Sequence, residues 1–354
     1  MDEYDEYMVN GKLDILSLSK EELKIFFTDE LGLKSYRADQ VRSWLNKSLG
    51  DIEFFQMGNI PKTERKIFED NLYIDNPKII KKQISSDGTI KYLLELRDKN
   101  TIESVFMRYI HGNTVCISTQ VGCRMSCAFC ASAAGGLSRN LLPSEMLSQL
   151  YVAWRDTGEK ISNVVLMGIG EPLDNFDNVL KFLELVNSPD GPNIGYRHIS
   201  LSTCGLVDKM QKLKEKKIPL TLSVSLHAAE NETRKKLMPI SGKWSIDKLL
   251  DACREYANFT KRRISFEYIL IDNINDSEQD AMLLAKKTKN ILCHINLILL
   301  NETAENNFKP LDMKKAQRFK DTLERFGANA TIRRKCGRDI EASCGQLRKN
   351  NLKT

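Results

Sequence analysis

The amino-acid sequence predicts an α/β protein: a partial (β/α)6 TIM-like barrel with a small N-terminal helical domain and a β-hairpin extension. Two observations support this prediction. From about residue 113, short apolar strand patterns alternate with longer helical patterns, as in a parallel sheet. The number of strand–helix units, about six, is too small for a closed eight-stranded barrel and therefore favours a partial one.

Residues 1–76 are predicted to form the helical domain. The sequence Ser19-Lys-Glu-Glu22 matches a capping box, in which a serine and a glutamate side chain satisfy backbone amides at a helix start. Gly32 is a typical helix end. Helices are expected at 19–31, 37–47 and 62–71. Such a module serves either RNA docking or packing alone, and both interpretations stay open.

Residues 77–112 are predicted to form a β-hairpin linker segment. Within 78–96, apolar and polar residues alternate around Ser86-Asp87-Gly88. An Asp-Gly pair between alternating strands is a strong hairpin signal. Pro77 marks the boundary with the helical domain.

Residues 113–354 are predicted to form the barrel and a C-terminal cysteine-bearing segment. Strands are expected at 114–119, 163–167, 198–202, 220–225, 263–271, 294–300 and 330–333. Helices are expected at 144–155, 177–186, 207–217, 245–256, 277–288 and 314–326. Parallel barrels carry functional residues where strands end, so the loops after these strands are where we expect a site.

The composition indicates a globular protein of a reducing compartment. An apolar content of 42% is sufficient for a core, and no run of about 18 apolar residues is present to span a membrane. The first residues, Met1-Asp-Glu-Tyr-Asp-Glu6, are unlike a signal peptide. Nine cysteines in 354 residues are too sparse for a disulfide framework. We therefore expect a cytoplasmic protein with free cysteines.

The formal net charge of +6 is mild, but the basic residues are unevenly placed. Those in the last 50 positions are Lys309, Lys314, Lys315, Arg318, Lys320, Arg325, Arg333, Arg334, Lys335, Arg338, Arg348, Lys349 and Lys353. Within 314–325 we interpret them as the solvated face of a helix. Arg333, Arg334, Lys335 and Arg338 lie close in sequence to Cys344, and we predict that they contact RNA phosphates.

The cysteine motif Cys123-x3-Cys127-x2-Cys130 carries the most specific chemistry. Three thiolates in eight residues can bind three irons of a cubane 4Fe-4S cluster and leave the fourth open to a substrate or cofactor. Structural zinc is the first alternative, but it needs four ligands, and no second CxxC pair or nearby histidine supplies the fourth. A chance spacing of the three cysteines is the other alternative. The iron–sulfur cluster is the favoured interpretation.

Glycines and polar residues follow other predicted strands. In Gly168-Ile-Gly170-Glu171-Pro172 the glycines let backbone groups approach a ligand closely. Ser202 and Ser225-Leu226-His227 can hydrogen-bond a ribose or a carboxylate, and Asn301 can read an adenine edge. Singly, each is as well explained as a satisfied polar residue at a strand end. Their shared placement at one end of the barrel predicts a ligand site.

These motifs resemble those of the RlmN/Cfr family of radical S-adenosylmethionine (SAM) enzymes, which methylate adenosine in RNA. The resemblance begins with CxxxCxxC and the aromatic Phe129 before its last cysteine. It extends in order over nearly the whole chain. The further stretches are Cys116-Ile-Ser-Thr-Gln-Val-Gly-Cys123, Gly168-Ile-Gly-Glu-Pro172, Leu201-Ser-Thr-Cys-Gly205, Ser225-Leu-His227 and Asp339-Ile-Glu-Ala-Ser-Cys-Gly-Gln-Leu347.

The resemblance implies a role for each residue. Cys123, Cys127 and Cys130 would hold the 4Fe-4S cluster, with SAM on its open iron. The implied SAM contacts are Gly170, Glu171, Ser202, Ser225, Leu226, His227 and Asn301. The implied catalytic residues are the methyl-carrying nucleophile Cys344, the resolving thiol Cys116 and the general base Glu103. Taken alone, Cys344 would be interpreted as a small buried thiol.

The implied reaction is methylation of adenine C2, an electron-poor carbon that direct attack on SAM does not explain. In the family's route, the Cys344 thiolate takes a methyl from one SAM. A second SAM gives a 5′-deoxyadenosyl radical, which activates that methyl for addition to C2. Glu103 then removes the C2 proton, and Cys116 attacks Cys344, which releases the base and leaves a disulfide.

The resemblance also implies the partners. The expected substrates are 23S ribosomal RNA, in the peptidyl-transferase region, and transfer RNA, at the adenosine 3′ to the anticodon. A flavodoxin- or ferredoxin-like electron donor, a monomeric state and no membrane are expected. Two alternatives stay open: C8 methylation of 23S rRNA, as in Cfr, and a non-catalytic iron–sulfur RNA-binding protein. The flanks at 199–205 and the basic C-terminus favour C2.

This interpretation does not explain a few features of the sequence. Cys204, Cys253 and Cys293 are predicted to be core residues, and Cys336 receives no role. The sequences at 131–136 and 302–306 depart from the commoner family pattern and put the shape of the RNA pocket in doubt.

Overall fold

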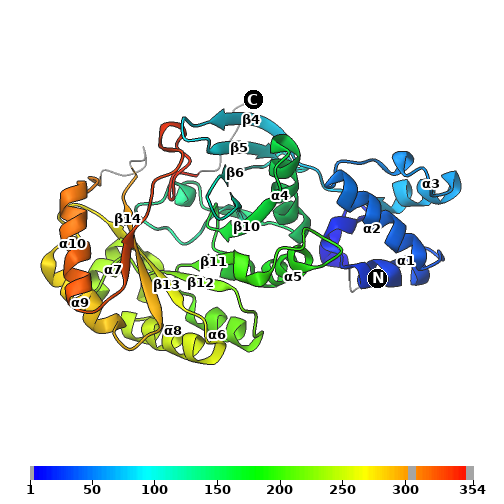
Figure 1. The fold of residues 1–354 in the computed structure, drawn as a ribbon. Helices are drawn as coiled ribbons and strands as arrows, with labels where there is room; N and C mark the ends of the chain where they lie inside the picture. Colours follow the sequence, from blue (N-terminus) through cyan, green and yellow to red (C-terminus); the bar gives the residue numbers. More distant parts are fainter. Residues whose placement is uncertain (1–3, 302–307, 348–354) are drawn as a thin grey trace.

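The computed structural model describes residues 4–301 and 308–347. Three helices and a small sheet form the N-terminal part, at one end of the molecule (Figure 1). They are α1 (Lys20–Asp29), α2 (Tyr36–Ser48), α3 (Lys62–Asn71), β1 (Met8–Val9), β2 (Lys12–Asp14) and β3 (Leu72–Tyr73). The predicted capping box is present, because Ser19 accepts a hydrogen bond from the Glu22 amide and Glu22 accepts one from the Ser19 amide.

Ten strands form the main sheet, in the order β15-β14-β13-β12-β11-β10-β7-β6-β5-β4. Seven of them are parallel: β7 (Asn113–Cys116), β10 (Ile161–Leu166), β11 (Ile199–Thr203), β12 (Thr221–Ser225), β13 (Ile264–Leu270), β14 (Cys293–Leu299) and β15 (Ala330–Ile332). All seven overlap predicted strands, which confirms the α/β class. Since β15 and β4 are the two edges, the described strands do not close into a barrel.

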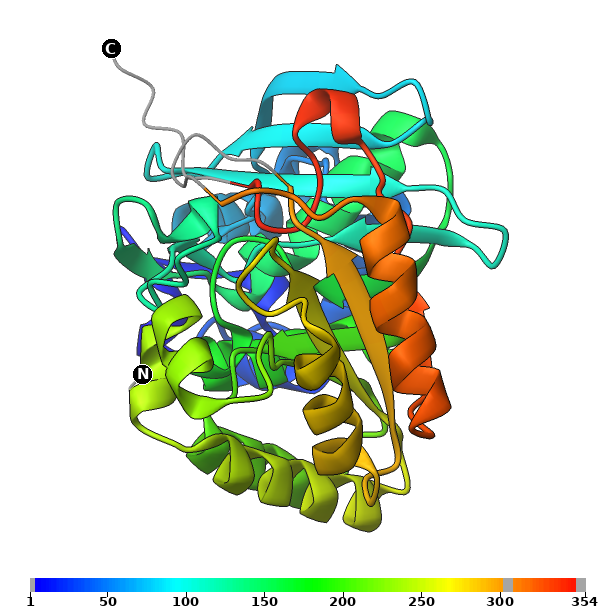
Figure 2. The same ribbon diagram turned by 90° about the vertical axis from the view of Figure 1, so that its left-hand side faces the viewer.

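Helices cover the outer side of the parallel strands (Figure 2). Six were predicted: α4 (Pro143–Thr157), α5 (Phe176–Asn187), α6 (Val207–Glu215), α8 (Ile246–Thr260), α9 (Glu278–Thr288) and α10 (Met313–Arg325). The short helix α7 (Asn231–Leu237) was not predicted. None of the described helices is long and apolar enough to cross a lipid bilayer.

The hairpin belongs to the main sheet. Its strands β4 (Lys78–Ile84) and β5 (Ile90–Glu95) pair as predicted. The next strand, β6 (Thr101–Met107), was missed; it pairs antiparallel with both β5 and β7. Every residue of β6 is buried, so the strand lacks the one-sided alternation that identifies strands in a sequence. The short strands β8 (Gln120–Gly122) and β9 (Leu137–Asn140) form a separate pair beside it.

Residues 333–347, called here the C-terminal segment, return across the face of β6 and β7. Ile340, Ala342 and Leu347 pack there against a cluster that includes Val105 and Cys116. Segments far apart in the sequence therefore meet at this face. The basic residues Arg348, Lys349 and Lys353 and the stretch 302–306 lie outside the described residues.

The hairpin turn holds one side of the C-terminal segment. The Gly337 amide donates to the Asp87 carboxylate at 3.0 Å, and the Ser86 amide donates to Asp339 at 3.0 Å. On the other side, the Ala131 amide of the cysteine loop donates to the Gly345 carbonyl at 2.8 Å. The predicted hairpin thus positions the end of the chain that carries Cys344.

The N-terminal domain has its own aromatic core, which provides a test of its stability. Phe27 and Phe68 are fully buried and stack at 5.0 Å. We expect Phe27→Ala to lower the free energy of unfolding by about 3–5 kcal/mol, because it removes this contact and leaves a cavity. Urea denaturation followed by tryptophan fluorescence measures it. Phe55, which is 63% exposed, gives the matched control: Phe55→Ala should change stability by no more than about 0.5 kcal/mol. Equal losses in the two variants would contradict this packing.

Candidate active site

The three cysteines of the motif line one cavity of about 150 Å³ at the carboxyl ends of the parallel strands. Their loop follows β8, whose last residue is Gly122. Gly122 has φ +81°, and a Cβ there would lie 1.9 Å from the Gly136 carbonyl oxygen. Only glycine fits, so this residue lets the two ends of the cysteine loop cross closely.

The donor set fits an iron–sulfur cluster better than a single metal ion. Burial raises the pKa of all three thiols, that of Cys123 to about 12, so a strong Lewis acid is needed to hold them as thiolates. Within residues 4–301 and 308–347, no three His, Cys, Asp or Glu side chains converge on one ion-sized position. Sulfur donors spread around a cavity are what a multi-iron cluster requires.

The glycine motif forms a second wall of this cavity. Gly170 has φ +109°, and a Cβ there would lie 2.7 Å from the side chain of Gln120. Glu171 is buried and accepts hydrogen bonds from the amides of Leu173 at 3.0 Å and Cys204 at 2.7 Å. Burial raises the pKa of the Glu171 carboxyl. Both residues line the cavity, as the sequence predicts for a ligand site.

Polar residues at the carboxyl ends of β11 and β12 complete that wall. Ser202, Ser225 and His227 line the cavity; Leu226 is buried beside them but is not among the lining residues that the structure describes. His227 has φ +58°, which turns its side chain and backbone away from the strand direction. Burial lowers its pKa to about 3, so the imidazole is neutral.

The tautomer of His227 follows from its hydrogen bond. The Ile269 amide donates to Nδ1 at 3.1 Å. Because an amide can only donate, Nδ1 carries no proton and Nε2 carries it. The ring also meets Phe129 edge to face at 4.8 Å. His227 thus offers a fixed, uncharged N–H donor at the cavity.

Arg234, on the unpredicted helix α7, ties the strand ends together. It is 1% exposed and donates to the carbonyls of Cys204 at 2.8 Å, Ser225 at 3.1 Å and Leu226 at 3.1 Å. Cys204, predicted to be a core residue, also lines the cavity. Arg234 is therefore a positioning residue that fixes two walls of the site.

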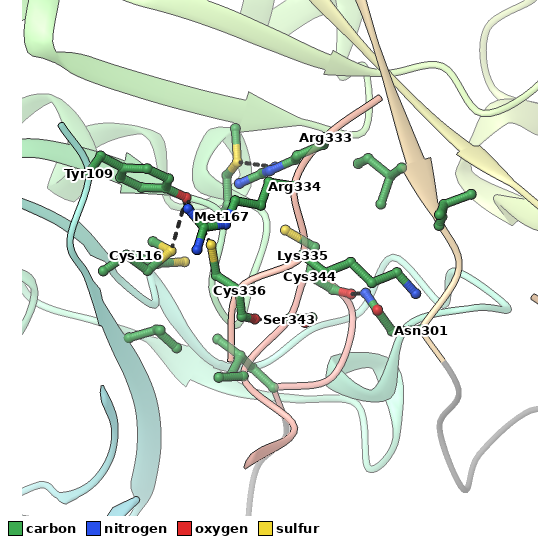
Figure 3. Close-up of a pocket in the computed structure, with 16 residues that line it drawn as sticks. Tyr109, Cys116, Met167, Asn301, Arg333, Arg334, Lys335, Cys336, Ser343 and Cys344 are labelled. Carbon is green, nitrogen blue, oxygen red and sulfur yellow. Dashed lines mark hydrogen bonds between the residues drawn. The ribbon is translucent and has the colours of Figure 1, made fainter. Parts of the chain in front are cut away.

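A second, smaller cavity of about 40 Å³ lies between β6, β7 and the C-terminal segment. Cys116 and Cys344 both line it, with Tyr109 and Cys336 (Figure 3). Four residues line both cavities: Met167, Ile298, Arg333 and Cys344. Cys344 therefore stands at the wall that separates the cysteine-motif cavity from the cavity of the other thiols.

All nine cysteines are free thiols in the structure, so the expected disulfide between Cys116 and Cys344 is not formed here. Burial and the neighbouring Cys344 raise the pKa of Cys116 to about 12. The two thiols come from segments more than 200 residues apart. The structure brings them to one cavity in the reduced state.

Arg333 was grouped with the RNA-contacting residues, but the structure places it between the two cavities. The Cys344 thiolate is the main cause that raises the pKa of the Arg333 guanidinium, and Glu267 adds to it. Nη1 of Arg333 lies 3.9 Å from Oε2 of Glu267, an oxygen that accepts no hydrogen bond. Glu267 is a carboxylate within the largely apolar sequence of β13. That placement signals a functional residue, but Glu267 was not predicted as one.

Asn301 lines the smaller cavity, whereas Glu103 is not among the described residues that line either cavity. Glu103, on β6, faces the same side of the sheet as Val105, which is paired with Cys116. Its buried carboxylate lies 3.4 Å from the Lys91 ammonium. Asn301 donates to the Cys344 carbonyl at 3.1 Å and lines the smaller cavity. Its observed contact is thus with the thiol-bearing segment.

Comparison with known proteins identifies the class. Residues 117–285 match the family model described as the radical SAM superfamily, and residues 13–74 match the ribosomal RNA large subunit methyltransferase N-terminal domain. The solved structure of a radical SAM methyltransferase from Sphaerobacter thermophilus has a TM-score of 0.90 and 37% identity, over 94% of this chain and 98% of that chain. The fold and the site define a radical SAM methyltransferase.

Sequence relatives narrow the family. A probable dual-specificity RNA methyltransferase RlmN from Clostridium novyi (strain NT) is 48% identical over 96% of this chain and 99% of its own. Another from Clostridium botulinum (strain Alaska E43 / Type E3) is 49% identical over 96% and 98%. The chain belongs to the RlmN family of SAM-dependent methyltransferases.

The three carbonyls bound by Arg234 provide a test of the site. We expect Arg234→Met to leave them without a buried donor, to destabilise the protein by about 2–5 kcal/mol and to weaken SAM binding by at least about tenfold. Urea denaturation and equilibrium dialysis measure the two effects. Lys236→Met, at an exposed position of the same helix, is the control and should change neither. Unchanged SAM affinity in Arg234→Met would show that Arg234 does not position the site.

Proposed function

We propose that the protein methylates C2 of adenosine in 23S ribosomal RNA and transfer RNA, by a relay through a methylated cysteine and with two molecules of SAM. The position of Cys344 in the wall between the two cavities is the observation that carries this proposal. A thiol there can receive a methyl from the SAM side and present it to a base on the other side. The names of the relatives, dual-specificity RNA methyltransferases, support RNA as the substrate.

The larger cavity would hold the cofactors. Cys123, Cys127 and Cys130 would ligate the cluster, and Gly170, Glu171, Ser202, Ser225 and His227 would bind SAM. When bound, a 4Fe-4S cluster with one open iron supplies the electron that cleaves SAM to a 5′-deoxyadenosyl radical. The neutral His227 and the fixed strand ends would orient SAM without adding charge to the site.

The second cavity would carry out the thiol chemistry. Cys344 would accept the methyl as its thiolate, in a cavity that it shares with the Arg333 guanidinium. Cys116 would later attack the sulfur of Cys344 and release the methylated base. Glu103 would remove the C2 proton. It lies two residues before Val105, which pairs with Cys116, and therefore on the same face of the sheet as Val105.

Several surfaces would serve the partners. The exposed Arg334 and Arg338 flank the site and suit RNA phosphates, and residues 1–76 would form an RNA-docking domain. A flavodoxin- or ferredoxin-like protein would supply electrons to a monomeric enzyme in the cytoplasm. Residues 77–112 would carry the hairpin, and 113–354 the radical SAM core.

Nucleoside analysis tests the proposed function. Expression in a strain that lacks its own RlmN, followed by mass spectrometry of digested RNA, should give 2-methyladenosine in both ribosomal and transfer RNA. The 8-methyladenosine isomer separates chromatographically and would indicate the alternative position. If neither product is detected although the cluster is intact and SAM is present, RNA methylation is ruled out.

Cluster ligation can be tested without an activity assay. We expect Cys127→Ala to lose most of the bound iron and sulfide after anaerobic reconstitution, because a cubane held by two thiolates is weakly bound. Iron and sulfide contents measure this. Cys293, half-buried and lining neither cavity, provides the matched control Cys293→Ala, which should keep the wild-type iron content. Wild-type iron in Cys127→Ala would contradict the ligand set.

The resolving role of Cys116 predicts a trapped intermediate. Cys116→Ala should accumulate RNA joined covalently to Cys344, because the thiol proposed to attack that sulfur is then absent. Denaturing gels and peptide mass spectrometry detect the adduct. Cys344→Ala should give neither adduct nor product. Release of methylated RNA from Cys116→Ala at the wild-type rate would show that another group resolves the adduct.

A further inference from the structure

Cys336 is a third thiol in the smaller cavity, and the proposed relay does not use it (Figure 3). It is half-buried and free. Its sulfur lies 3.5 Å from the Tyr109 hydroxyl. The cavity, about 40 Å³ in volume, has room for only a few water molecules. Three thiols that line so small a space are available to one another for exchange.

Local structure places Cys336 and Cys344 at the two ends of one turn. The Ala342 amide donates to the Gly337 carbonyl at 3.0 Å, and the Ser343 hydroxyl donates to the Cys336 carbonyl at 2.9 Å. Both thiols therefore face the same sheet surface, where Cys116 ends strand β7. Each would pair with Cys116 by a shift of the C-terminal segment, since all three are free thiols in the structure.

We propose that Cys336 is a second resolving thiol, which opens the disulfide that turnover leaves between Cys116 and Cys344 and so restores Cys344. This inference rests on the proposed function. The Cys336 thiolate attacks the sulfur of Cys116. A Cys336–Cys116 bond forms, the Cys116–Cys344 bond breaks, and its electron pair leaves on Cys344 as a thiolate. The proton of Cys336 goes to solvent, and the exchange is redox-neutral.

The direction of this exchange follows from the surroundings of the two sulfurs. Thiol–disulfide exchange expels the sulfur with the lower pKa more readily. Burial raises the pKa of Cys116 to about 12, which makes it a poor leaving group. Arg333 lines the same cavity as Cys344 and places a guanidinium near the sulfur that departs. Expulsion of Cys344 rather than Cys116 also returns the thiol that the next turnover needs.

The exchange would keep the oxidised bond within reach of a reductant while it frees Cys344, because Cys336 and Cys344 are both half-buried. Cys116 is only 8% exposed, whereas Cys336 is half-buried on the C-terminal segment. A dithiol reductant can then attack Cys336 and reduce the Cys336–Cys116 bond by a second exchange, in which the reductant becomes the disulfide. The product is the fully reduced three-thiol site.

Disulfide mapping tests this role in the full-length, cluster-reconstituted protein. After a single turnover with SAM and RNA, the sample is quenched with acid, alkylated and digested, and linked peptides are identified by mass spectrometry. We expect a Cys336–Cys116 linkage beside the Cys116–Cys344 linkage, at comparable abundance. If the Cys116–Cys344 linkage is present but Cys336 is recovered only as the alkylated free thiol, the role of Cys336 is overturned and the proposed relay still stands. The absence of any linkage to Cys116 overturns the proposed relay as well.

A rate measurement adds an independent readout. With micromolar dithiol reductant, Cys336→Ser should regain free Cys344 at least about tenfold more slowly than wild type, since an internal thiol acts at roughly millimolar effective concentration. The first turnover of this variant should be normal. Cys293→Ser, outside both cavities, should match wild type in both measurements. Equal reset rates in wild type and Cys336→Ser would overturn the role of Cys336.

Discussion

The hydrogen bonds that hold the C-terminal segment between the hairpin turn and the cysteine loop set the geometry of the whole site. Asp87 binds the Gly337 amide from one side, and the Gly345 carbonyl binds the Ala131 amide from the other. Cys344 lies within this span, at the wall of two cavities. Without both attachments, a thiol near the end of a 354-residue chain would have no fixed position relative to β7. The antiparallel extension of the sheet is therefore part of the active site.

Two arginines and a neutral histidine set the charge around the two cavities. The buried guanidinium of Arg234 neutralises the carbonyl-rich strand ends beside the motif cysteines, while Arg333 serves the second cavity. His227 stays uncharged in the same surroundings, because burial and Arg234 both disfavour its protonation. A low-dielectric site can hold thiolates only when such cations are fixed nearby. The two arginines do not lie in any motif that the sequence singled out for SAM.

The regular part of the fold could be predicted from the sequence. The alternation of strands and helices from residue 113 identified all seven parallel strands, because each carries apolar residues, either in a short run or alternating with polar ones, between turn residues. Strand β6 and helix α7 were missed. The first is buried on both faces, and the second is a seven-residue helix whose position depends on one arginine and the strand ends that it binds. Contacts with distant parts of the chain, rather than the local sequence, determine strand β6 and helix α7.

The site was predictable to the extent that its residues fall in motifs. Cys123, Cys127, Cys130, Gly170 and Glu171 were found by spacing and line one cavity as expected. Asn301 was assigned to the same cavity but donates to the backbone of Cys344 in the other. Arg333, which lines both cavities, and Glu267, which lines the larger one beside it, were missed as site residues, because no sequence pattern reveals where the cavities meet.

The small size of the thiol cavity has a consequence for substrate entry. A space of about 40 Å³ admits a few waters but not a purine ring. Under the proposed function, an adenine that approaches Cys344 from this side would require residues 336–344 to shift away from β6 and β7, with loss of their contacts there. Cys116 is the least accessible of the three thiols, because it is only 8% exposed whereas Cys336 and Cys344 are half-buried. The thiol of β7 is thus the one that the chain's own C-terminal segment covers most fully.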